Sequence, residues 1–167
     1  MEQHLADLIE ALGSDDGSRR KRARETLALL GEPAVQQLHG LLSSPNMRIR
    51  WEAANCLAAM VDPGSVPAFV QLMMDQYSEV RWLAASGLIS LGPRSVAPVL
   101  ESLIQDAESS GHRQMARRVL RGLSSGNDVL AEIVGPVVDV LGHADSAVIA
   151  SKAAVVLNEL GQTAGPR

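Results

Sequence analysis

Aromatic residues are almost absent from this chain, whose 167 residues include one Phe, one Tyr and two Trp. Since 46% of the residues are nevertheless hydrophobic, the core has to be built mainly from Ala, Leu and Val. A mixture with so few strand-favouring residues suits close packing between helices better than it suits a sheet. The composition therefore predicts an all-α fold.

Cysteine and long apolar runs are also scarce. Cys56 is the single cysteine, which excludes an internal disulfide, and its Ala and Leu neighbours predict an inert buried thiol. No apolar run reaches the roughly 20 residues that a membrane span needs. The first residues are acidic where a secretory signal would be basic. With a formal net charge of -4, we expect a cytoplasmic protein and no membrane partner.

Catalytic constellations are missing from the sequence as well. The four histidines lie far apart without the spacing of a metal site, and we expect them on the surface or in loops: His4, His39, His112 and His143. The chain has no glycine-rich phosphate loop and no nucleophile beside a plausible base. These absences predict that the protein is not an enzyme and has no catalytic residue, metal or cofactor.

What the sequence does contain is an internal repeat. "VRWLAASGL" begins at Val80 and closely matches "IRWEAANCL", which begins 31 residues earlier at Ile49. The final leucine has equivalents throughout the chain, namely Leu27, Leu57, Leu88, Leu120 and Leu157. An alanine precedes each of them by four residues: Ala23, Ala53, Ala84, Ala116 and Ala153. Residues four apart share one face of a helix, so these positions predict a buried packing stripe.

A second family of apolar segments alternates with the first. It is marked by Leu38 and Leu41, Phe69 and Leu72, Leu100 and Leu103, and Val138 and Leu141. Turn signals such as "SSPN", "VDPGS" and "LGPRS" separate the two families and predict five helix pairs. The second helices are expected at about 18–30, 46–60, 77–91, 111–123 and 145–160. The predicted repeats are 1–31, 32–61, 62–92, 93–124 and 125–161.

These residues resemble the HEAT repeat, and in particular its short bacterial variant in phycobilisome lyase proteins. The third repeat carries the pattern as Asp75, Val80, Arg81, Ala84, Ala85, Leu88, Leu91 and Gly92, followed by "SVAPVLESL". The resemblance covers the whole chain and is weakest in the fifth repeat, where Ala150 replaces the arginine. It implies a single domain, 1–167, forming a right-handed α-solenoid whose second helices line a concave surface.

The same resemblance implies a structural role for a recurrent arginine. Arg20, Arg50, Arg81 and Arg113 occupy the repeat position at which family members place a basic residue. There, the side chain ties its helix to the preceding turn. These arginines are therefore interpreted as structural.

The two tryptophans have a different helical phase. A rotation of about 100° per residue places Trp82 on the side of its helix opposite the buried stripe, and Trp51 likewise. Stacked second helices would bring the indoles within roughly 10 Å of each other. They are either an exposed binding anchor or a cover over small alanines, and the sequence leaves both interpretations open.

Charge is divided unevenly between the predicted helices. The second helices hold 13 of the 15 Lys and Arg but only five of the 19 Asp and Glu. A basic rim around the tryptophans predicts the following partner-binding residues: Lys21, Arg24, Arg48, Trp51, Asn55, Trp82, Ser86, Ile89, Gln114, Arg117, Arg118 and Arg121. Some of these charges are expected only to solvate their helices.

The function predicted from this surface is a scaffold that holds an acidic, partly helical segment of a protein partner. Nucleic acid is a less favoured partner, suggested by resemblance to HEAT-like alkylpurine DNA glycosylases and opposed by the negative net charge. A third hypothesis, from the repeat subtype, is a lyase-like subunit acting on a tetrapyrrole-bearing protein.

The last repeat departs from the others. Gly135 and Pro136 interrupt an apolar segment, which predicts a first helix that starts early and bends at the proline. The second helix carries Val148, Val155 and Val156 where a terminal repeat should be polar. This end of the chain is therefore predicted to be a docking surface or a dimer contact.

Overall fold

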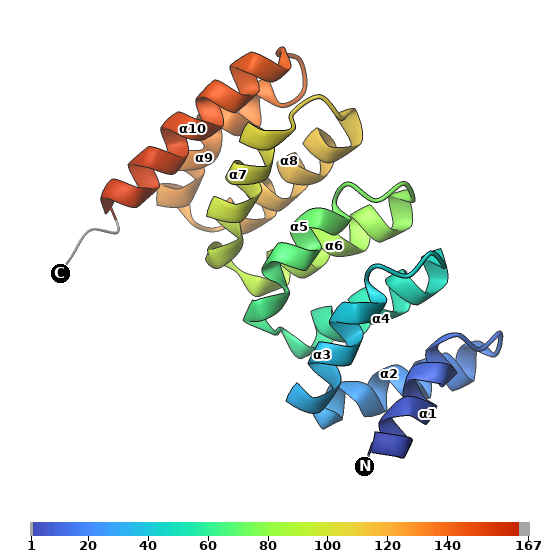
Figure 1. The fold of residues 1–167 in the computed structure, drawn as a ribbon. Helices are drawn as coiled ribbons and strands as arrows, with labels where there is room; N and C mark the ends of the chain where they lie inside the picture. Colours follow the sequence, from blue (N-terminus) through green and yellow to red (C-terminus); the bar gives the residue numbers. More distant parts are fainter. Residues whose placement is uncertain (1, 164–167) are drawn as a thin grey trace. The chain divides into compact units, whose positions relative to one another are not determined.

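The computed structural model describes residues 2–163, and every regular element in that range is helical (Figure 1). The helices divide between two compact units, one ending at Ser90 and the other starting at Leu91. This division lies close to the end of the third predicted repeat. The predicted all-α class is confirmed, while the single domain with its repeat bounds stays a prediction.

The first unit consists of three successive helix pairs. They are α1 (Glu2–Leu12) with α2 (Gly17–Leu30), α3 (Glu32–Leu41) with α4 (Met47–Met60), and the 3-10 turn η1 (Pro63–Ser65) and α5 (Val66–Leu72) with α6 (Ser78–Leu91). Helix α2 packs against both α1 and α4, and α4 packs against α3. The predicted second helices thus begin and end within one residue of α2, α4 and α6.

The second unit contains the remaining four helices. They are α7 (Val96–Gln105), preceded by the 3-10 turn η2 (Pro93–Ser95), then α8 (Ser110–Ser124), α9 (Asp128–Val140) and α10 (Ser146–Thr163). Helix α10 packs along α7 and α9, while α8 packs along α7 and α9 from the other side. Figure 1 shows α7 and α10 together in front of α8 and α9. The last pair, α9 and α10, is therefore reversed. Its second helix, α10, lies beside α7, which is the first helix of the pair before it.

This reversal corrects one sequence expectation. Segment 145–160 was expected to continue the row of second helices after α8, but α10 lies along α7 instead. Pro136 does lie inside α9, as expected. Only three residues link α8 to α9, and these two helices pack against each other. Helix α10 then packs against α7 and α9.

Side-chain caps explain where several helices begin. Asp16, Asn46, Ser109 and Asn127 each accept a hydrogen bond from a backbone N–H of the first helical turn. Such caps satisfy donors that have no partner within the helix. The segments "SDD", "SPN" and "SSGN" thus stop one helix and start the next.

The predicted packing stripe is buried. Ala53, Ala84, Ala116 and Ala153 are 0% exposed and Ala23 is 2% exposed, which confirms the expectation for this series. The leucines four residues later are also fully buried, apart from Leu157, which is half-buried in α10. Because alanine is small, neighbouring helices can approach closely along this stripe.

We expect Ala84→Leu to lower the free energy of unfolding by about 1–3 kcal/mol, because three added carbons have no space at a fully buried site. Urea denaturation monitored by circular dichroism measures the effect. The matched control is Ala59→Leu, which adds the same atoms at an exposed position of α4. An Ala84→Leu variant as stable as Ala59→Leu would show that the stripe is not tightly packed.

One turn of the repeat carries backbone strain. Gly31 (φ 67°) and Gly92 (φ 80°) end α2 and α6 with positive φ, a region that glycine enters without penalty. Val61 occupies the corresponding place after α4 with φ 51°, although it is β-branched. The chain therefore has a positive φ at all three positions, but only Val61 has the left-handed helical conformation.

We expect Val61→Gly to raise the free energy of unfolding by about 1 kcal/mol, because it relieves the left-handed strain of a non-glycine residue. Val61 is 49% exposed, so little packing is lost with its side chain. Thermal unfolding of the two proteins measures the change. A lower melting temperature in the variant would mean that packing by Val61 outweighs its strain.

The recurrent arginine has the structural role that the resemblance implies. Nη1 of Arg20, Arg50 and Arg81 donates to the carbonyl oxygens six and five residues earlier, at 2.7 to 3.2 Å. In Arg113 the same atom donates to the Ala107 carbonyl at 3.0 Å. Each arginine thus ties its helix to the turn before it. The acceptors are backbone carbonyls, including those of Asp15 and Asp75, and not the carboxylate of an aspartate in that turn.

Asp75 pairs with the arginine of the previous repeat. Arg50 donates from Nε to Asp75 Oδ2 at 2.7 Å and from Nη2 to Oδ1 at 3.0 Å, and the two side chains are only 9% and 6% exposed. Asp75 Oδ1 also accepts from the Tyr77 backbone N–H, at the start of α6. This bidentate pair therefore joins the turn before α6 to α4.

One histidine contradicts the sequence expectation. His112 is 0% exposed, whereas all four histidines were expected on the surface or in loops. Its Nδ1 lies 2.7 Å from the Asp106 carbonyl and its Nε2 lies 3.0 Å from Ser102 Oγ. These two polar groups allow a neutral imidazole to be buried in the second unit.

Burial lowers the pKa of His112 below its ordinary value of 6.5, although the Asp106 carbonyl and the nearby Asp106 carboxylate raise it. Neutral His112 is therefore favoured by folding, and its contribution to stability is complete above about pH 6.5. We expect the melting temperature to fall as the pH drops below 6.5, through the lower pKa of the folded state. His112→Gln should flatten this part of the pH profile.

Candidate functional site

The two tryptophans line one hollow in the first unit. Trp51 of α4 and Trp82 of α6 surround it together with Ser78, Glu79 and Leu83, all from the beginning of α6. Its volume is about 430 Å3. We call this site the tryptophan hollow. This volume lies within the range of pockets that bind small ligands, and it has room for more than one side chain of a partner.

Both indoles are accessible in the hollow. Trp82 is 53% exposed and Trp51 is half-buried, which confirms the partial exposure predicted from helical phase. An indole with half of its surface in water gains free energy when a partner covers it. The hollow therefore has the apolar surface that a binding anchor needs.

The Trp51 ring lies next to an ionic network formed by Arg24, Arg20 and the buried Glu52. The guanidinium of Arg24 lies 5.7 Å from the centre of the Trp51 ring. Arg24 Nη1 also donates to Glu52 Oε2, and Arg20 Nε donates to Glu52 Oε1 at 2.7 Å. The Glu52 side chain is only 2% exposed. Arg24, predicted to contact a partner, is thus engaged by Glu52 and Trp51.

Cys56 lies one turn beyond this network and is 1% exposed. Burial raises the pKa of its thiol to about 12, with Arg24 lowering it and Glu52 raising it by smaller amounts. A thiolate, the nucleophilic form, is therefore scarce at neutral pH. This agrees with the predicted inert thiol.

Other predicted binding residues of the first unit do not line the hollow. Lys21 lies 3.8 Å from Glu25 along α2, and Arg48 Nη1 donates to Asp15 Oδ1 at 2.7 Å. Ser86 donates to the Trp82 carbonyl, and Asn55 and Ile89 are half-buried. Carboxylates therefore neutralise much of the basic charge expected here, which disfavours a nucleic-acid interface.

The remaining predicted residues lie on α8 in the second unit. Gln114, Arg118 and Arg121 are exposed and Arg117 is half-buried. Nε of Arg117 is buried and has no hydrogen-bond partner among the described residues. A basic rim that includes this group and the tryptophans stays a prediction, because the hollow itself belongs to the first unit.

Sequence reasoning missed Ser78 and Leu83 as lining residues and favoured Ser86 and Ile89 instead. The reason is the direction of helical side chains, which lean toward the N-terminus of their helix. The surface beside Trp82 is therefore that of the preceding turn, where Ser78 and Glu79 lie. The helical spacing of three and four residues before Trp82 could have identified Glu79 and Ser78 as lining residues. Nothing in the repeat pattern identifies Leu83.

A Ser, a His and an Asp also come together in the first unit. Ser65 Oγ donates to Asp62 Oδ2 at 2.9 Å, and His39 Nε2 lies 2.9 Å from the same hydroxyl. Ser65 is 0% exposed and gives its proton to the carboxylate rather than to the histidine. The arrangement therefore stabilises the turn before α5 and lacks the geometry of an activated nucleophile.

Within residues 2–163, no group of three or more His, Cys, Asp or Glu side chains is placed to hold a metal ion. No helix of that range is both long enough and apolar enough to cross a bilayer.

Comparisons with known proteins identify the repeat type. The family model described as HEAT repeats matches residues 5–89. A chain from the structure of the complex of CpcE and CpcF of phycocyanin lyase from Nostoc sp. PCC7120 is similar in fold, with a TM-score of 0.64 and 23% identity over 93% of this chain and 99% of that one. An engineered protein has a TM-score of 0.50 and 23% identity over 93% and 79%. No curated protein matches the sequence.

These comparisons confirm the predicted solenoid class of HEAT-like helix pairs and correct another prediction. The chain was expected not to be an enzyme, because its sequence lacks catalytic motifs. That prediction is contradicted, since a component of a phycocyanin lyase has the same fold.

Proposed function

Because the chain belongs to the HEAT-repeat family, we propose that it is a scaffold that binds a segment of a protein partner in the tryptophan hollow. The observation that supports this proposal is the position of Trp82, which is 53% exposed and lines the hollow together with a second indole. Tryptophans in such positions often supply most of the energy of an interface.

The charges near the hollow suggest the chemistry of the partner segment. Glu79 lines the hollow, so the side chain that enters it should be apolar or aromatic rather than acidic. Arg19, Lys21 and Arg22 are exposed on α2, which packs against the helix of Trp51. We propose an apolar anchor followed by acidic residues that these cations attract. The protein itself is proposed to be cytoplasmic, as was expected from its composition.

Retention of proteins from the native cell extract tests this proposal. The immobilised wild-type chain should retain a partner that immobilised Trp82→Ala does not. The matched control is Leu29→Ala, which removes another exposed apolar side chain from the same unit and should retain the partner fully. Equal retention by all three proteins would refute a role for the hollow.

A second candidate is a component of a lyase that acts on a tetrapyrrole-bearing protein. The observation in its favour is the similarity to the phycocyanin lyase complex, which extends over 99% of the matched chain. Gel filtration of the chain mixed with phycocyanin tests this candidate. Co-elution would support it, and separate elution at ~50 μM of each protein would count against it.

A further inference from the structure

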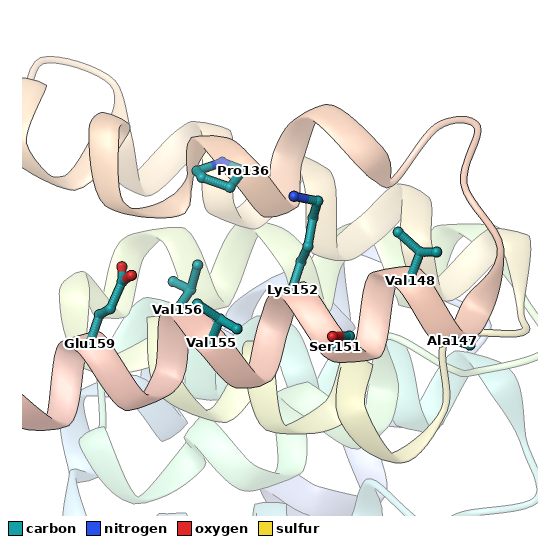
Figure 2. A pocket seen from close by; sticks show the side chains of 8 residues that line it. All are labelled: Pro136, Ala147, Val148, Ser151, Lys152, Val155, Val156 and Glu159. Atoms are coloured by element: carbon teal, nitrogen blue, oxygen red, sulfur yellow. The ribbon is translucent and has the colours of Figure 1, made fainter.

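The outer face of α10 forms a second apolar groove, entirely within the second unit. Its lining includes Val148, Lys152, Val155 and Glu159 from α10 and Pro136 from α9 (Figure 2). The groove has a volume of about 520 Å3. Val148 and Val155 are 44% and 56% exposed, although Ile149, Ala153 and Val156 of the same helix are buried in the unit. Helix α10 therefore carries apolar side chains on both its inner and its outer face.

The outer residues of α10 follow the spacing of a helix-pairing seam. Val148, Lys152, Val155 and Glu159 are separated by four, three and four residues. Alternating spacings of four and three residues are those by which two helices pack along each other. Figure 2 shows Val148, Lys152 and Glu159 extending from α10 toward the side where α9 lies. The groove is thus shaped to receive another helix alongside α10.

The charges of this seam indicate which helix fits. Lys152 and Glu159 have opposite charge and lie on either side of Val155. They are roughly 10 Å apart along the helix axis, too far to pair with each other. Neither forms an ion pair with another residue in the described range 2–163.

A second α10 running antiparallel would place its Glu159 opposite Lys152 and its Lys152 opposite Glu159. Val155 would then meet its own counterpart near the two-fold axis, as in an isologous interface. A parallel second copy would instead place like charges opposite each other. We propose that two copies of this chain associate through antiparallel α10 helices, with reciprocal Lys152 and Glu159 pairs. This inference does not depend on the tryptophan hollow.

Sedimentation equilibrium of the full chain at low salt tests the dimer. We expect a concentration-dependent monomer–dimer equilibrium for the wild type. Lys152→Glu and Glu159→Lys should each weaken association by about tenfold or more, because each creates two like-charge contacts per dimer. The double variant Lys152→Glu/Glu159→Lys should return the dissociation constant to within about threefold of the wild type, since it restores both pairs.

Two further variants complete the experiment. Arg94→Glu makes the same change of net charge as Lys152→Glu at an exposed position before α7 and should leave association unchanged. Val155→Asp should reduce association at least as strongly as either single reversal. All the mutated side chains are exposed, and circular dichroism verifies that the variants fold. A wild type that stays monomeric to ~200 μM, single reversals without effect, or a double variant as weak as the singles would each overturn the proposal.

Discussion

Asp75→Ala should lower the free energy of unfolding by about 3–5 kcal/mol, the typical cost of removing one partner of a buried ion pair. The substitution leaves the Arg50 guanidinium, 9% exposed, without acceptors for Nε and Nη2. It also removes the side-chain acceptor for the Tyr77 backbone N–H at the start of α6. Two successive repeats would thus lose a buried ionic connection.

Urea denaturation at pH 7 measures this effect, and a double-mutant cycle isolates it. Arg50→Leu/Asp75→Leu should be far less destabilised than the sum of its single substitutions, because no buried charge remains unpaired. Asp15→Ala serves as the control. It breaks the fully exposed pair with Arg48 and should leave the denaturation midpoint nearly unchanged. Strict additivity in the cycle would mean that the pair is not coupled.

The pKa of Asp75 gives the pH range of this contribution. Burial alone would raise that pKa, but hydrogen bonds from Arg50 and the Tyr77 N–H, together with the charges of Arg50 and Arg81, hold it below its ordinary value. The folded state therefore favours the carboxylate. Its stabilisation is complete above the unfolded pKa of about 3.9 and is lost as the pH falls through the folded pKa. The stabilisation by neutral His112 is lost in a different pH range, which begins below pH 6.5.

Trp82→Ala should weaken binding of the retained partner by about 2 kcal/mol or more, close to a thirtyfold rise in Kd, with little change in stability. The exposed indole leaves few packing contacts to lose when it is removed from the free protein. In the complex, the same indole would be desolvated at the centre of the contact. Isothermal titration with the partner and thermal unfolding, performed on one preparation, measure both quantities.

Trp51→Ala is the informative comparison, because it removes the same side chain from the opposite side of the hollow. Trp51 is half-buried and lies against Arg24, so its loss should reduce both partner affinity and stability. If Trp82→Ala instead costs stability and spares binding, the indole serves as a cover over the helices, the other interpretation that the sequence left open.

Helix positions were predictable because they depend on local signals. The Ala and Leu stripe repeats within single helices, and caps such as Asn46 and Ser109 mark where helices begin. Partial exposure of Trp51 and Trp82 follows from the same helical phase. These features need only the angle between residues on one helix, which the sequence determines whatever that helix packs against.

Contacts between repeats were not predictable in this way. Arg50 and Asp75 are 25 residues apart, and Arg24 and Glu52 are 28 apart, so nothing local indicates that they pair. Asp75 and Arg81 belong to the same repeat pattern, yet the Asp75 carboxylate pairs with Arg50 of the repeat before it. The tertiary structure therefore decided which arginines pair with carboxylates of other repeats and which are left to contact a partner.

The sequence by itself determined the helix pairs, the alanine stripe and the phase of both indoles, since each follows from periodicity along one helix. Only the tertiary structure decided that α10 lies along α7, that His112 is buried and that the hollow opens beside Ser78 and Glu79. The physical reason is that a helix with apolar residues on two faces, such as α10, can bury either one. Which face is buried depends on the position of the neighbouring helices, and this leaves Val148 and Val155 exposed.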